Sequence, residues 1–402
     1  MSSARAGSEL ARTLLAPELR ARLIALRRDL HQHPELSFAE GRTKDVLARE
    51  LERLAPAGLD HVARTGLIAR FAGRNPRAPV VAIRGDIDAL PIQEATGLPF
   101  ASVHAGVMHA CGHDVHATWT IGAAALLAES PAEGDVLVVL QPAEEIGEGA
   151  AAVLASGLLG GVTAIFGAHV DRRFTVGQVV AQAGPLAASA DVFAIVLVGR
   201  GAHGARPHEA SDPIVCMAAL ISALQTIVSR RVNPATPAVV TIGSVNAGTA
   251  ANVIPERAEL HGTLRATDRE TRALLHFELR EIAKHIAAAH HVEATVTFGA
   301  GVPPVINDAR AARWAAAAAQ DVLGSDAVVP LGITNMAGED FAWYQERMPG
   351  CFLRVGAREP DQQVIAAHSP QFDVAEDAIF VGAAVLAECA RRASAAVAAE
   401  DV

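Results

Sequence analysis

Short runs of Val, Ile and Leu alternate with segments of helical pattern through the first half of the chain. The runs at 80–83, 136–140 and 164–168 carry no polar side chain, so strands formed there would be apolar on both faces. Segments that favour helices lie between them, at 115–128 and 148–157. Strands buried on both faces and separated by helices are typical of a sheet with helices on both sides. The sequence therefore predicts an α/β fold.

The pattern changes near residue 187. Strands and helices then follow in the order β-α-β-β-α-β, which is the ferredoxin-like arrangement. One helix is expected to begin after Asp212 with Pro213 in its first turn, and the other after Thr267 or Asp268, because such residues cap helices. The four strands of this block are expected at 190–198, 238–246, 257–266 and 292–298.

This block predicts an inserted domain at 187–297. The surrounding domain would then consist of two parts, 1–186 and 298–402. Its remaining helices are expected at 18–33, 39–54, 308–322, 339–346 and 375–398.

Composition excludes several classes of protein. The net charge of −10 arises from 34 basic and 44 acidic residues, and no run of Lys or Arg forms a stripe for phosphates, so nucleic acid is not an expected partner. Four cysteines are too few for a disulfide scaffold in 402 residues, which favours a reducing compartment. Apolar stretches such as 192–199 fall short of the roughly 18 residues of a membrane span, and Arg5, Glu9 and Arg12 interrupt the N-terminal segment. We expect a cytoplasmic protein without a membrane partner.

The segment MHACGHDVHAT (108–118) places a thiol and an imidazole, Cys111 and His113, two positions apart. A Cys-x-His pair alone is a weak metal signal. Further acidic or histidine-containing segments stand at the ends of hydrophobic runs: GDIDALPI (85–92), QPAEE (141–145), IFGAHV (165–170) and AAHSPQFD (366–373). Together they indicate a metal-dependent hydrolase whose site is assembled from across the chain.

Three of these segments follow predicted strands, and ligands of open α/β sheets bind beyond the carboxyl ends of strands. A hydrolytic metal site needs ligands, an open position for water, and a base that does not bind the metal. The adjacent Glu144 and Glu145 suit two such roles, because neighbouring side chains in an extended segment point in opposite directions. A solvated acidic loop is the alternative, and the position of the pair after a buried strand speaks against it.

These residues resemble the amidohydrolase branch of the aminoacylase/carboxypeptidase metallopeptidases. That branch contains hippurate hydrolases, N-acyl-amino-acid amidohydrolases and plant enzymes that release indole-acetic acid from amino-acid conjugates. The resemblance runs from DLHQHPELSF (29–38) to HSPQFD (368–373), and MHACGHD together with PAEE is highly specific to the branch.

The resemblance implies two divalent metal ions and a general base, Glu144, that takes a proton from the attacking water and returns it to the leaving amine. Asp88 would orient a metal ligand. In the wider family the segment around it reads His-x-Asp; here Asp86 stands in the place of that His, and His113 is expected to supply the missing imidazole. The implied metal ligands, with Cys111 as the bridge, are Cys111, His113, Glu145, His169 and His368.

The insert also resembles the family. GRGAHGARPH (199–208) matches the loop whose histidine, here His203, completes the active site of the neighbouring subunit and binds the oxyanion of the tetrahedral intermediate. Asn252 and Arg265 match positions that contact the substrate, and we expect them at its carboxylate; a surface salt bridge is the alternative for Arg265. The insert is thus expected to be a lid and dimerisation domain, and the protein a homodimer.

The remaining histidines of these motifs are expected to be structural. His31 and His33 do not share a helix face. His109 and His116 flank the metal motif without filling a ligand position, so local hydrogen bonding is expected for both. Cys216, Cys351 and Cys389 are expected in the core.

The expected reaction is hydrolysis of an N-acyl amino acid to a carboxylic acid and a free amino acid. A shell of sulfur, nitrogen and oxygen donors admits zinc, cobalt, nickel or manganese. A carboxypeptidase or dipeptidase acting on short peptides with the same machinery is the alternative function. A non-catalytic metal-binding protein is disfavoured, because Glu144 and His203 would have no role in it.

Overall fold

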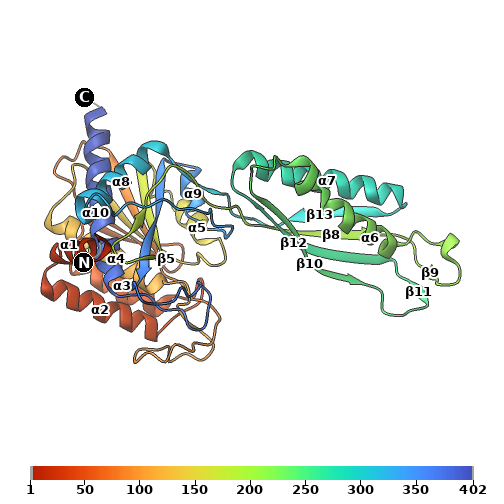
Figure 1. Cartoon of the computed structure of the whole chain (residues 1–402), viewed down its shortest axis with the longest axis horizontal. Coiled ribbons are helices and arrows are strands. Elements are labelled where there is room, and N and C mark those ends of the chain that lie inside the picture. Colours follow the sequence, from red (N-terminus) through yellow and green to blue (C-terminus); the bar gives the residue numbers. More distant parts are fainter. Residues whose placement is uncertain (1–2, 401–402) are drawn as a thin grey trace. The chain divides into compact units, whose positions relative to one another are not determined.

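The computed structural model describes residues 3–400, and the chain divides into two compact units. Unit 2 comprises Pro185–Val305 and Ile333–Glu339; unit 1 comprises the residues before Pro185, the segment Ile306–Gly332, and the residues from Asp340 onward. Unit 2 therefore contains the whole segment 187–297 and extends beyond it at both ends. Figure 1 labels the α-helices and several strands of both units.

Unit 1 contains a mixed seven-stranded sheet in the order β1-β2-β4-β3-β5-β15-β6. The four central strands β4, β3, β5 and β15 are parallel, and the strands at the edges pair antiparallel. The strands are β1 (Gly58–Val62), β2 (Gly66–Phe71), β3 (Val80–Asp86), β4 (Val136–Gln141), β5 (Val162–Thr175), β6 (Val179–Val180) and β15 (Gly350–Arg358). Two short strands, β7 (Gly184–Ala187) and β14 (Val305–Asn307), lie where the chain passes between the units.

Helices cover this sheet on both faces. On one face, α3, α4, α10 and α8 form a layer in which each helix contacts the next and also the strands below. The other face holds α5 and α9, with Phe341 against Gly167 of β5. The helices of unit 1 are α1 (Ser3–Thr13), α2 (Pro17–Gln32), α3 (Gly41–Glu52), α4 (His113–Glu129), α5 (Gly149–Ala155), α8 (Ala309–Leu323), α9 (Ala342–Gln345) and α10 (Asp377–Glu400).

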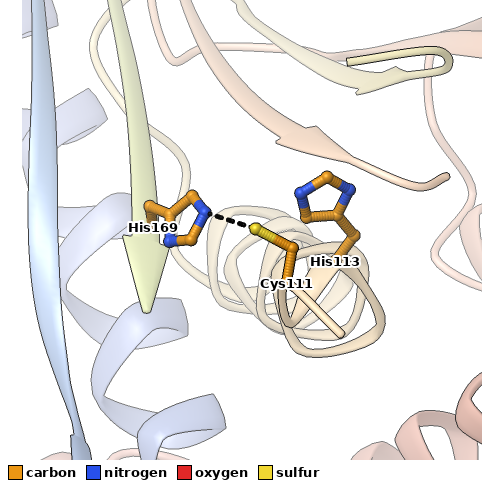
Figure 2. Close-up of side chains that lie close together, drawn as sticks. All are labelled: Cys111, His113 and His169. Atoms are coloured by element: carbon orange, nitrogen blue, oxygen red, sulfur yellow. Dashed lines mark hydrogen bonds between the residues drawn. The ribbon is translucent and has the colours of Figure 1, made fainter. Parts of the chain in front are cut away.

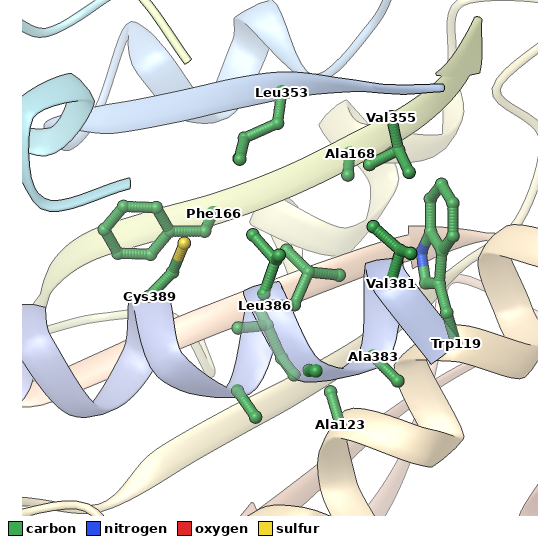
Figure 3. Packing of buried hydrophobic residues seen from close by; sticks show 14 of the residues in the cluster. Trp119, Ala123, Phe166, Ala168, Leu353, Val355, Val381, Ala383, Leu386 and Cys389 are labelled. Atoms are coloured by element: carbon green, nitrogen blue, oxygen red, sulfur yellow. The ribbon is translucent and has the colours of Figure 1, made fainter. Parts of the chain in front are cut away.

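The core of unit 1 lies between α10, α4 and the central strands. Figure 3 shows Leu386 and Cys389 of α10 facing Phe166 of β5, while Trp119 of α4 lies at the other end of the same layer. Gly382 of α10 is required there, because a Cβ at that position would lie 2.2 Å from the Trp119 ring. His113 is the first residue of α4, so this packing also fixes the position of the Cys111–His113 motif.

The predicted α/β class with helices on both faces is confirmed. The predicted helices are present to within a few residues, and the shortest of them, 339–346, is reduced to the four residues of α9. The helix α1, the strand β15 and the short strands β1, β6, β7 and β14 were not predicted. Arg354 interrupts the apolar run of β15, and its side chain is nevertheless buried, with the guanidinium 5.6 Å from the Phe352 ring centroid.

Unit 2 has the predicted β-α-β-β-α-β order, with an antiparallel sheet in the order β10-β12-β8-β13. Asp212 and Asp268 cap the two helices, each accepting a backbone N–H from the first turn. The elements are β8 (Asp191–Val198), α6 (Pro213–Leu224), β10 (Ala238–Ala247), β12 (Arg257–Ala266), α7 (Arg269–Ala289) and β13 (Glu293–Phe298), with short strands β9 (Ala202–His203) and β11 (Val253–Ile254), a 3-10 turn (Pro207–Glu209) and a π turn (Ile227–Arg231).

One helical segment among residues 3–400, Pro213–Arg231, has the length and hydropathy of a membrane span. Its apolar side chains Met217, Leu220 and Leu224 pack in the core of unit 2. The opposite face is exposed, and the segment ends in two arginines. The segment therefore covers one side of a sheet, with Ile214, Val215 and Val228 exposed on its outer side.

Candidate metal centre

The candidate ligands lie beyond the carboxyl ends of the parallel strands. β3 ends at Asp86 and β4 at Gln141, just before Asp88 and the Glu144–Glu145 pair. His169 was predicted to follow its strand, which is wrong: it lies inside β5, which continues to Thr175. The pairing of β5 with β3 ends at Gly167, so β5 projects past its neighbour and carries His169 to the same edge of the sheet.

Cys111 and His113 are separated by a glycine that no other residue could replace without strain. Gly112 has φ +88°, and a Cβ there would lie 2.6 Å from Val170 Cγ2. The left-handed turn at Gly112 starts α4 immediately, so the imidazole of His113 projects from the first residue of a buried helix. In the view of Figure 2 the sulfur of Cys111 lies between the rings of His113 and His169.

The five predicted ligands converge in unit 1 as two groups that share Cys111. One group is Cys111, His113 and His169, and the other is Cys111, Glu145 and His368. Within each group the donor atoms lie within 4.8 Å of one another. Cys111 Sγ is 3.2 Å from His169 Nε2. A sulfur common to two sets of donors is the geometry expected of a bridging thiolate.

Asp88 holds His113 in a single orientation. His113 Nδ1 is 3.1 Å from Asp88 Oδ1, while Asp88 Oδ2 accepts hydrogen bonds from Ser37 Oγ and from the backbone N–H of Glu145. This leaves Nε2 of His113 facing the cluster, 3.7 Å from both Glu144 Oε2 and Glu145 Oε1. Burial opposes the charged form of His113, but the carboxylates of Asp86 and Asp88 raise its pKa well above the usual value.

His169 presents its Nε2 in the same way. Its Nδ1 donates to the carbonyl oxygen of Val170 at 2.7 Å, which leaves Nε2 toward Cys111. Burial and the neighbouring His116 and Arg354 lower the pKa of His169 well below its usual value. The ring is therefore neutral, the form that binds metals.

Glu145 belongs to the group with Cys111 and His368 and also lies near His113 of the other group. Its Oε2 lies 3.5 Å from Nε2 of His368, and burial, followed by the charges of Asp88 and Asp86, raises its pKa to about 7 against the opposing effect of His113. His368 has a φ of +67°, a left-handed conformation that is strained for a residue with a Cβ. Its backbone N–H donates to Ala110 O at 2.8 Å, which ties the segment to the Cys111 motif.

The donor set fits divalent metal ions. Among residues 3–400, the buried atoms without a hydrogen-bond partner include His113 Nε2 and Glu145 Oε1, both of which face the cluster. Buried polar atoms are rarely left unpaired, so such atoms call for an ion or water. Sulfur, imidazole nitrogen and carboxylate oxygen together suit zinc and its neighbours in the first transition row.

Asp86 lies beside the cluster, with its Oδ1 3.9 Å from His113 Nε2, and forms a further candidate donor group with His113 and His116. Its carboxylate binds the guanidinium of Arg84 and lies 2.6 Å from Nδ1 of His116. Nε2 of His116 then accepts the backbone N–H of Val170, the residue after His169. The expected local hydrogen bonding of His116 is thus confirmed. That of His109 is wrong: it is buried, and neither ring nitrogen has a partner among residues 3–400.

The other three predicted site residues belong to unit 2. His203 and Asn252 meet at the ribbon of β9 and β11, where the backbone N–H of Gly204 donates to Asn252 O at 2.7 Å. His203 is exposed, and its Nδ1 accepts from the N–H of Ala205 at 3.0 Å. Arg265 is half-buried on β12, opposite Val239 of β10. The metal cluster lies in unit 1, whereas these three residues lie in unit 2. Their contribution to the active site therefore stays a prediction.

Beneath the metal motif lies a buried charge cluster that sequence analysis missed. Asp114, next to His113, binds Arg27 Nε at 2.8 Å and His31 Nδ1 at 2.8 Å. His31 Nε2 lies 3.3 Å from Glu94 Oε1. Asp114 at the start of the largely apolar helix α4 was the available signal. Burial opposes the charged form of His31, but Asp114 and Glu94 raise its pKa to about 9.

This shift predicts a pH-dependent stability. Because the pKa of His31 in the folded protein, about 9, exceeds the 6.5 of an unfolded histidine, its stabilisation is complete below pH 6.5 and is lost as the pH rises through 9. The full loss is about 3 kcal/mol. The free energy of unfolding, measured by chemical denaturation at pH 6.5 and pH 9.5, should fall more between these two pH values for the wild-type protein than for His31→Gln. Equal declines would contradict the assignment.

The chain was compared with known proteins. A model of Peptidase family M20/M25/M40 matches residues 82–392. An N-acetylcysteine deacetylase of Bacillus subtilis is 44% identical over 92% of this chain and 96% of its own length. An IAA-amino acid hydrolase of Arabidopsis thaliana is 36% identical over 93% of this chain and 86% of its own length.

A solved structure is similar throughout. It is a dinuclear metal binding peptidase from the M20 family of Bacillus subtilis, with a TM-score of 0.82 and 40% sequence identity. The match covers 94% of this chain and 98% of that one, so it includes segments of both units.

Proposed function

The chain belongs to Peptidase family M20/M25/M40, and on this premise we propose that it hydrolyses the amide bond of N-acyl amino acids. It is a metal-dependent amide hydrolase that binds two metal ions. The observation that carries the proposal is the pair of donor groups sharing Cys111, with Glu144 beside them. The names of the relatives, a deacetylase of N-acetylcysteine and a hydrolase of an amino-acid conjugate, support an acyl group on one side of the amide and an amino acid on the other.

The metal ions would be held by Cys111, His113, Glu145, His169 and His368. When bound, they activate water and polarise the carbonyl of the scissile amide. The mixed donor set is compatible with zinc, manganese, cobalt or nickel.

Glu144 is the general base in this proposal. It takes a proton from the attacking water and passes it to the nitrogen of the leaving amine. Asp88 keeps Nε2 of His113 aimed at the cluster, with the contacts described above. Arg265 and Asn252 bind the carboxylate of the amino acid, a task that suits the two parallel N–H donors of a guanidinium.

A substrate panel tests the function. Metal-reconstituted protein is mixed with N-acetyl amino acids, including N-acetylcysteine, and with unblocked dipeptides, and the free amino acid released is measured. We expect release from the N-acyl compounds. Release from dipeptides alone would favour the carboxypeptidase or dipeptidase alternative, and metal binding without any release would favour a non-catalytic protein. Protein stripped with a chelator is the control.

The protein is further proposed to be a cytoplasmic homodimer that pairs through unit 2. All four cysteines are free and buried, as expected in a reducing compartment. Strand β10 lies at the edge of the unit 2 sheet, where a second copy could pair with it. His203 is exposed on its ribbon, consistent with a residue that acts in the site of a partner.

Subunit mixing tests this arrangement. His203 is expected to bind the oxyanion, so His203→Ala should lower kcat by about 10²–10³-fold. If His203 acts across the dimer, unfolding and refolding a mixture of His203→Ala and Glu144→Gln produces mixed dimers with one intact site. Activity should return to about a quarter of the wild-type value for random pairing of equal amounts. If activity does not recover in the mixed dimers, His203 either acts in the site of its own subunit or has no role in catalysis.

A further inference from the structure

Glu40 is a buried carboxylate that the proposed chemistry leaves without a role. It lies two residues beyond the motif DLHQHPELSF (29–38) and is fully buried. Its Oε2 accepts a hydrogen bond from Thr65 Oγ1 at 2.6 Å. Its Oε1 accepts one from the backbone N–H of Ala143 at 2.9 Å. Burying an acidic group costs free energy unless hydrogen bonds compensate for it. The groups that Glu40 binds are therefore expected to explain its position.

The backbone that Glu40 binds is strained. Ala143 has a φ of +54°, in the left-handed region that residues with a Cβ rarely adopt. Such conformations persist only where the surrounding structure over-determines them, and they cluster at functional sites. Ala143 immediately precedes Glu144, so the turn at Ala143 decides the direction in which the Glu144 side chain leaves the backbone.

The loop that carries Glu144 is tied at both sides by buried carboxylates. Glu40 accepts the N–H of Ala143 on one side, and Asp88 accepts the N–H of Glu145 at 3.1 Å on the other. The loop then closes on itself, because the N–H of Gly149 donates to Ala143 O at 3.1 Å. Asp88 already has a function through His113, whereas Glu40 contacts none of the predicted ligands in the hydrogen bonds described.

From these contacts we infer that Glu40 is a positioning residue for Glu144: its hydrogen bond to the Ala143 amide holds the left-handed turn that aims the general base. The inference rests on the proposed function, in which Glu144 moves the proton. Glu40 itself touches neither substrate nor metal. Its loss should therefore lower the rate of the chemical step and leave substrate and metal binding intact.

Two substitutions at Glu40 separate the hydrogen bond from the charge. Glu40→Gln keeps a carbonyl oxygen for the Ala143 N–H and should retain kcat within about threefold of wild type. Glu40→Met fills similar space without an acceptor and should lower kcat by about 10–100-fold, because small misplacements of a catalytic group have effects of this size. KM and the bound metal measured by mass spectrometry should remain as in wild type. A wild-type kcat in Glu40→Met, or a loss of kcat that follows loss of metal, would overturn the inference.

A second substitution that relieves the strain at Ala143 should restore activity only if Glu40 acts by holding this turn, and not if Glu40 merely packs in the core. Glycine adopts positive φ without strain. Ala143→Gly added to Glu40→Met should therefore recover part of the lost kcat, and alone it should be close to wild type; no recovery would overturn the inference. If Glu40→Met does not fold, the nearly isosteric Thr65→Val takes its place and should lower kcat about two- to fivefold, while a wild-type kcat there would overturn the inference.

A parallel measurement of Glu144→Gln separates the two proposals. If Glu144→Gln is inactive while Glu40→Met turns over like wild type, only the positioning role is wrong. If Glu144→Gln is itself active, the assignment of the base is wrong, whatever Glu40→Met does.

Discussion

Glu144→Gln is expected to retain both metal ions and to lower kcat by at least about 10²–10⁴-fold, the range of general acid–base catalysis. The amide cannot take a proton from the attacking water, yet its size matches that of the carboxylate and it keeps one of the two acceptor oxygens. Glu144 Oε2 lies 3.7 Å from His113 Nε2, and Glu144 forms a donor group with His113 and Glu145. It belongs to neither of the two groups that share Cys111, so metal content should change little. Turnover and bound metal are measured on the same preparation.

Glu148→Gln is the matched control for this variant. Glu148 stands four residues later, at the N-terminal end of α5, and is exposed. The same change of charge there should leave kcat close to wild type. A Glu144→Gln protein that retains activity near wild type would refute the assignment of the base.

Cys111→Ala is expected to reduce bound metal from two ions to one or none. The sulfur is the only donor common to the two groups at the centre, and its loss removes a ligand from each. Loss of a residue that only orients a metal ligand lowers metal affinity by roughly 10–100-fold. The affinity of Cys111→Ala for metal should fall by more than this. Bound metal after dialysis against a weak chelator measures the effect, and hydrolysis should fall with it.

Cys389→Ala controls for the loss of a buried thiol. Cys389 is also buried, in the core of the same unit, where its sulfur faces Phe166, and it belongs to none of the donor groups found among residues 3–400. It should keep both metal ions despite some loss of stability from the cavity left behind. Two ions retained in Cys111→Ala would exclude a bridging role for the sulfur.

The sequence was most informative where periodicity and chemistry coincide. The buried strands β3 and β4 could be read from their unbroken apolar runs, and the residues after them were expected at one edge of the sheet. The donor residues could be chosen because Cys111, His113 and the Glu144–Glu145 pair match family motifs. Those motifs also led to His169 and His368, which are 199 residues apart along the chain but near Cys111 in the structure.

The features that escaped prediction depend on side-chain contacts that the local sequence pattern does not reveal. Arg354 made β15 look unlike a central strand, although the aromatic ring of Phe352 accommodates the buried guanidinium. Asp86 stood at a ligand position of the wider family, but its partner His116 reaches it only when β3 meets α4. Glu40 and Ala143 are 103 positions apart, and nothing in either local sequence signals the hydrogen bond between them.

The central claim is that two metal ions, held by ligands that share Cys111, hydrolyse N-acyl amino acids. Titration of metal-stripped protein with manganese or zinc tests it most directly, with bound metal and free amino acid released from an N-acetyl amino acid measured at each point. We predict that hydrolysis rises as metal binds and reaches its maximum at two ions per chain. Full activity at one ion per chain, or no release of amino acid with two ions bound, would contradict the account.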